Sequence, residues 1–115
     1  MPERWLGKVR SLAYSGRIVR ISRRPAIYVY LGSGRDHVIV GGIYCSCEGF
    51  TRRAQRLEGC THVFAVRLAA SEGRIASVEL PPRLAARIVW EVLTGGLTRT
   101  LRETIYRRGL EEDVG

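Results

Sequence analysis

The feature that most constrains this chain is the placement of its three cysteines and one of its two histidines. Cys45 and Cys47 form a C-x-C pair, and after twelve further residues Cys60 and His62 form a C-x-H pair. Zinc favours four thiolate or imidazole ligands in a tetrahedron, and structural zinc sites use all four positions. The pattern therefore predicts one structural Zn²⁺ ion held by Cys45, Cys47, Cys60 and His62.

The spacing within each pair predicts where the ligands lie. Residues two apart in a strand point to the same side, so Cys45 and Cys47 can end an extended run and face one ion. Residues two apart in a helix point in different directions. Cys60 is therefore expected just before a helix, where the helix dipole favours its thiolate, and His62 in the first turn.

The cysteines allow three other interpretations. They could be buried apolar residues beside an unrelated histidine. A catalytic zinc is disfavoured because four protein ligands leave no open position for water. A redox pair is disfavoured because the chain has no C-x-x-C motif.

Hydrophobic periodicity predicts an α+β fold within a single domain, residues 1–115. We expect a small zinc-stabilised antiparallel sheet (a hairpin) plus a helix, flanked by an N-terminal helix and a C-terminal helical pair. The zinc module covers about residues 14–72 and the helical hairpin about 81–109. The expected elements are a helix over 3–14, extended runs over 17–22, 26–32 and 37–44, a helix over 61–71, an extended piece over 75–80, and helices over 82–93 and 98–108.

Several positions carry more detailed predictions. Tyr28 and Tyr30 alternate with three aliphatic residues, and burial under the first helix is favoured over a stacking platform for bases. The C-terminal pair is expected to be a packed hairpin rather than a DNA-binding helix-turn-helix, because the first of its helices carries a broad apolar stripe. Thr100 and Glu103 have the spacing of a capping box. His37 is assigned to a solvated turn and given no role.

The charge is concentrated in the first half of the chain. The net charge is +8, and 18 of the 19 basic residues are arginines. Residues 1–60 contain 11 basic and 4 acidic side chains, whereas residues 61–115 contain 8 and 7. A basic surface indicates an anionic partner such as DNA, although arginine-rich chains are also common in heat-adapted organisms. The candidate DNA-binding residues are Arg52, Arg53 and Arg56 between the ligand pairs, with Arg17, Arg20, Arg23 and Arg24 around the first extended run.

The ligand segments, CSCEGF at residues 45–50 and CTHVFAV at 60–66, closely resemble the SWIM zinc finger. That family combines a C-x-C pair and a C-x-H pair across a variable spacer, with an aromatic residue after the second cysteine and an apolar helix after the histidine. The resemblance covers about residues 14–72 and implies zinc on a ββα scaffold with a DNA-binding or protein-interaction role. A free-standing chain of this size looks most like prokaryotic, archaeal-type members and recombination mediators of the Shu-complex type, which act beside RecA-like recombinases.

Sequence patterns disfavour other classes of function. No Ser/His/Asp arrangement, paired carboxylates, phosphate loop or dinucleotide motif is present, so no enzyme is predicted. No apolar run is long enough to span a bilayer and the start lacks a signal pattern, so we expect a cytoplasmic protein without a membrane partner, nucleoid-associated if it binds DNA. The leading hypothesis is a zinc-stabilised module that binds DNA and a recombinase- or ATPase-type partner in recombination or repair. The alternative is a protein-interaction module without nucleic-acid binding.

Overall fold

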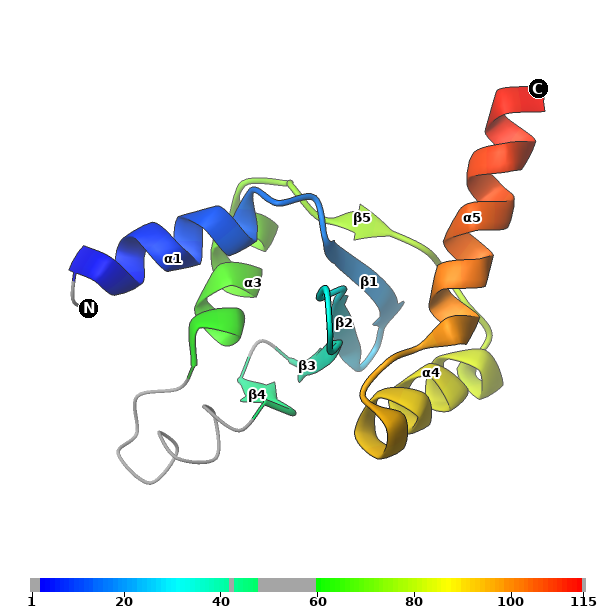
Figure 1. Ribbon diagram of the computed structural model, residues 1–115, viewed down its shortest axis with the longest axis horizontal. Coiled ribbons are helices and arrows are strands. Elements are labelled where there is room, and N and C mark those ends of the chain that lie inside the picture. The colour runs from blue at the N-terminus through cyan, green and yellow to red at the C-terminus, as the bar shows by residue number, and fades with distance from the viewer. Residues whose placement is uncertain (1–2, 42, 48–59, 115) are drawn as a thin grey trace.

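Figure 1 shows the computed structural model, which describes residues 3–41, 43–47 and 60–114. This part of the chain contains four helices and five strands, so the predicted α+β class is confirmed. In chain order the elements are α1 (Glu3–Ala13), β1 (Ile18–Arg23), β2 (Ala26–Tyr30), β3 (His37–Val40), β4 (Tyr44–Cys45), α3 (Thr61–Ser71), β5 (Ala76–Ser77), α4 (Pro82–Gly95) and α5 (Arg99–Val114).

The strands form one sheet in the order β4-β3-β2-β1-β5. Strands β1 to β4 pair antiparallel, as predicted, whereas β5 joins the edge of β1 in the parallel direction. The run expected over residues 37–44 is two strands, because Gly41 has a left-handed φ of 63° and turns the chain between them. Gly42, the second glycine of this interruption, lies outside the described residues.

The two faces of the sheet carry different helices (Figure 1). Strand β2 shows the cause, because its residues alternate between the faces. Ile27 and Val29 belong to a core shared with α4 and α5. Tyr28 and Tyr30 pack, half-buried, against a second core formed with α1 and α3. The predicted alternation is confirmed, as is the burial of both tyrosines.

The C-terminal pair packs on the sheet as predicted. Ala85, Ile88 and Val92 recur at helical spacing on α4 and are buried, and Ile88 lies in the same core as Val29 of the sheet. The apolar stripe therefore faces the protein core, which favours the packed hairpin over a helix-turn-helix. None of the helices in the described part of the chain has the length and apolar character that a membrane crossing requires.

The start of α5 differs from the prediction. Thr98 precedes the helix and its Oγ1 accepts a hydrogen bond from the Leu101 amide at 3.1 Å, so Thr98 is the capping residue. The capping box assigned to Thr100 and Glu103 is wrong, because α5 already begins at Arg99. The helix also continues to Val114, beyond the predicted end at residue 108.

A buried carboxylate connects the β2–β3 turn to the α4–α5 corner. Asp36 is fully buried. Its Oδ1 accepts hydrogen bonds from the Gly32 amide at 3.1 Å and from Arg102 Nη2 at 2.7 Å. Its Oδ2 accepts from the Thr98 amide at 2.8 Å and from Arg102 Nη1. The turn is tight enough that a Cβ on Gly32 would lie 2.0 Å from the carbonyl oxygen of Arg35, so only glycine fits there.

Candidate metal centre

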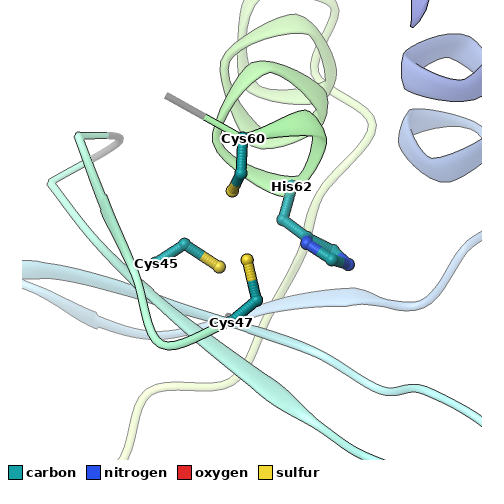
Figure 2. Close-up of side chains that lie close together, drawn as sticks. All are labelled: Cys45, Cys47, Cys60 and His62. Carbon is teal, nitrogen blue, oxygen red and sulfur yellow. The ribbon is translucent and has the colours of Figure 1, made fainter. Parts of the chain in front are cut away.

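The structure brings all four predicted ligands into one cluster. The ligand atoms of Cys45, Cys47, Cys60 and His62 all lie within 4.8 Å of one another. In Figure 2 the three thiol groups point toward a common centre, and the His62 imidazole lies beside them. A tetrahedral ion about 2.3 Å from each sulfur separates its ligands by about 3.8 Å, close to this arrangement. The cluster is therefore compatible with one metal ion.

On the sheet side, the residue between the first two cysteines holds both in place. Cys45 ends β4 and lies opposite Ile39 of β3. Ser46 is bound twice to Val38: its amide donates to the Val38 carbonyl and its Oγ accepts from the Val38 amide, both at 3.0 Å. These bonds hold the backbone extended beside β3, so Cys45 and Cys47 face the same side, as the two-residue period requires.

On the helix side, the predicted placement of the second pair is confirmed. Cys60 has an extended backbone (φ −121°, ψ 168°) and directly precedes α3, where it makes no side-chain capping bond. His62 is the second residue of α3, so the two side chains are not held to the spacing of a regular helix. Figure 2 shows the Cys60 thiol pointing toward those of Cys45 and Cys47, with the His62 imidazole beside them.

The electrostatics of the cluster fit a cation. Hydrogen bonds with Cys47 and Cys60, together with burial, raise the pKa of the Cys45 thiol, so without a cation it holds its proton. Burial lowers the pKa of His62, but its interactions with the adjacent Cys47 and Cys60 thiols outweigh this effect and raise the pKa to about 9.

The donor atoms of the cluster are compatible with a metal. The Nδ1 atom of His62 is buried and has no hydrogen-bond partner among the described residues. A divalent ion would replace the thiol protons of the cysteines and use the lone pairs of sulfur and nitrogen. Three sulfur donors and one imidazole suit Zn²⁺ or another thiophilic metal.

His37 lies beside the cluster, so its assignment to a solvated turn is wrong. Its ring centroid is 4.2 Å from that of His62, and the Tyr30 ring lies 5.3 Å from His62. Burial lowers the pKa of His37, and the neighbouring His62 adds to this effect. Strand register could have shown this position: His37 pairs with Tyr30, and opposed residues share a face of the sheet.

The structure brings two of the arginines predicted around β1 onto one face. A bulge between Arg20 and Ser22 shifts the register, so Arg20 opposes Tyr28 and Arg23 opposes Ala26. Both arginines therefore lie on the face that carries the tyrosines. Arg20 donates to Ser77 Oγ at 3.3 Å, and Arg23 pairs with Glu79 at 3.1 Å.

The other predicted arginines lie elsewhere. Arg17 is exposed before β1, and strand alternation directs it to the face opposite to Ile18. Arg24 is exposed in the turn between β1 and β2. The remaining three, Arg52, Arg53 and Arg56, lie outside the described residues.

Comparison with known proteins supplies no assignment. No protein-family model, no curated protein and no solved structure matches the chain.

Proposed function

We propose that this protein is a binding module built around one structural zinc ion, and that it contacts DNA through its arginine-rich first half. The observation that carries the proposal is the buried cluster of three thiols and one imidazole within 4.8 Å. With four protein ligands the coordination shell of the ion is complete, so the role is architectural and the protein is not expected to be an enzyme.

The zinc would connect the sheet to α3, because its two pairs of ligands lie on either side of residues 48–59. Cys47 lies at the end of the sheet segment and Cys60 at the start of α3. Residues 48–59, which include Arg52, Arg53 and Arg56, lie between these two ligands in the sequence. Anchoring both ends reduces the conformational entropy that the segment loses on binding, which favours preorganised contacts of arginine with phosphate.

DNA is the proposed ligand because of the charge. The chain carries +8, almost all of it from arginine, and guanidinium groups bind phosphates in a bidentate manner. Arg20 and Arg23 are the described candidates that share a face of the sheet. The resemblance to SWIM zinc fingers is the reason to propose an accessory role in recombination or repair, beside a recombinase- or ATPase-type partner.

Salt dependence of DNA binding tests this proposal. Fluorescence anisotropy with labelled single- and double-stranded DNA is expected to show an affinity that falls steeply as salt rises. Replacing Arg52, Arg53 and Arg56 together by alanine should reduce the slope of log K against log salt by about 2 to 3. Arg10→Ala, an exposed arginine of α1, is the matched control. Absence of binding at low salt would refute the DNA-binding proposal.

The second candidate is a protein-interaction module without nucleic-acid binding. It is favoured by one observation: Trp90, Leu93 and Leu97 are large apolar side chains that are 67%, 51% and 45% exposed at the α4–α5 corner. Binding through such a surface should depend weakly on salt, which separates it from phosphate-driven binding.

A further inference from the structure

The outward face of α4 presents apolar side chains that the fold does not use. Ala85, Ile88 and Val92 of this helix face the core. Trp90 and Leu93, which are three residues apart and so lie side by side on a helix, point away from it and are exposed. Leu97 continues the exposed apolar surface into the turn before α5.

The surface is hollowed on both sides of this turn. A hollow of about 550 Å³ is lined by residues that include Leu97, Thr98 and Arg99. A second, of about 300 Å³, is lined by residues that include Leu93 and Arg35. The two hollows share Thr94 and Gly95, the last residues of α4. Depressions beside exposed leucines can accept bulky apolar groups from a partner.

Positive charge surrounds these apolar residues. Arg83 and Arg87 precede Trp90 by seven and three residues, so they share its side of α4. Arg35 and Arg99 line the two hollows. In the described part of the chain, no carboxylate lies within ion-pair distance of Arg35, Arg83 or Arg99.

The acidic residues of the C-terminal half offset this charge only in part. Glu91 accepts hydrogen bonds from the hydroxyls of Thr98 and Thr100 and lies 3.8 Å from Arg87. Glu103 is exposed on α5 and follows Arg99 by four positions, and Glu79 pairs with Arg23 of the sheet. Among the described residues, Arg35, Arg83 and Arg99 have no ion-paired carboxylate, so the corner is cationic.

The charge and the apolar side chains of this corner favour one kind of binding partner over others. In a two-fold symmetric dimer, a second copy of the chain would place the same arginines against each other, and like charges repel. A DNA backbone would satisfy the arginines but offers little to the aliphatic side chains of Leu93 and Leu97. A protein segment that carries both carboxylates and bulky apolar side chains satisfies both.

We propose that Trp90, Leu93 and Leu97 form a docking surface for an acidic segment of a partner protein, with apolar anchors in the hollows and carboxylates on Arg35, Arg83 and Arg99. The proposal deepens the protein-binding candidate given above and does not depend on DNA binding.

A display library of random peptides of about 16 residues, long enough for four helical turns, tests this docking surface. The full-length, zinc-loaded chain is the target, and peptides that also bind its Trp90→Ala/Leu93→Ala variant are removed. Enriched peptides are expected to be net negative and to contain at least two large apolar residues. Anisotropy with those peptides should show affinity about tenfold or more weaker for the double variant. A charge reversal, Arg83→Glu/Arg99→Glu, should also weaken binding.

Controls separate the possible outcomes. Leu6→Ala, an exposed apolar residue of α1, should leave peptide binding unchanged. The proposal is overturned if no acidic peptide is enriched over the double variant. It is also overturned if single-stranded DNA binds through Trp90 and displaces the peptides, because the surface would then be a base-stacking platform. If the triple arginine variant loses DNA binding but still binds the peptides, the result bears on the proposed DNA-binding function and leaves the docking surface unaffected.

Discussion

The two faces of the sheet are joined to their helices by different chemistry. On the tyrosine face, the three thiols and the His62 imidazole lie together between the sheet and α3, in a cluster that is compatible with one metal ion. On the opposite face, Asp36 connects the β2–β3 turn to the α4–α5 corner, and groups of the protein itself supply its donors. With the proposed metal bound, one junction would be completed by an external ion, whereas the other is made entirely of groups of the chain.

This difference indicates which treatments should destabilise each junction. A small domain buries a limited apolar core, so we expect chelation of a metal bound at the first junction to affect its stability strongly. The second junction cannot be removed by chelation, but it can be broken by substitution, because it is made of an ion pair and hydrogen bonds between groups of the chain. Three perturbations, taken from the largest expected effect to the smallest, test the contrast.

Removal of the metal is expected to have the largest effect. A structural zinc site contributes on the order of 10 kcal/mol, as much as the whole stability of a typical domain. Treatment with a strong chelator, or Cys47→Ser, should therefore unfold the chain, as followed by circular dichroism with zinc content measured in parallel. Hydrogen exchange should show α3 losing protection at lower chelator concentration than α4.

Restoring zinc after chelation is the matched control, and it should recover the folded signal. Purified protein is expected to contain one zinc per chain. A chain that stays fully folded without metal would contradict the architectural role of the cluster.

Loss of Arg102 is expected to rank second. Arg102→Met would leave the Asp36 carboxylate, which is fully buried, with only backbone donors. Breaking a buried ion pair from one side costs about 3 kcal/mol or more. Urea denaturation of the zinc-loaded protein measures the change. Arg99→Met, an exposed neighbour on the same helix, should change stability by less than about 0.5 kcal/mol; equal effects of the two substitutions would mean that the ion pair contributes nothing.

The sequence predicted the first of these junctions but not the second. The metal cluster could be predicted because its information is local: two short pairs of ligand residues define both the donors and their strand or helix setting. The placement of Cys60 before α3 and of His62 in its first turn followed from the angular period of a helix. The alternation of the tyrosines with aliphatic residues in β2 was predicted in the same way.

The Asp36 junction could not be predicted because its partners are distant in sequence. Arg102 is 66 residues from Asp36, and no local period relates a turn aspartate to a helix arginine. The capping error had the same origin: Thr100 resembled a capping residue, but its hydroxyl donates to Glu91 of the neighbouring helix at 2.7 Å. His37 was misplaced because its surroundings depend on the pairing of β2 with β3.

The smallest expected effect is the pH dependence of the α4–α5 corner. Desolvation opposes ionisation of Glu91, but hydrogen bonds from Thr100 and Thr98 outweigh it and lower the pKa of this carboxyl below its ordinary value of 4.5. A carboxyl with a lower pKa in the folded state stabilises the fold above its unfolded-state pKa, and this contribution is lost as pH falls through the folded-state value.

Glu91→Gln should therefore cost about 1 kcal/mol at neutral pH and should flatten the loss of stability below about pH 4.5. Urea denaturation of zinc-loaded protein between pH 7 and the acid limit at which zinc is retained measures both effects. Because zinc release also destabilises the fold in acid, the decisive quantity is the difference between wild type and variant at each pH. Glu103→Gln, an exposed carboxyl on α5, controls for the change in charge. A difference between wild type and Glu91→Gln that does not shrink toward low pH would show that the Glu91 carboxylate does not stabilise the corner through its charge.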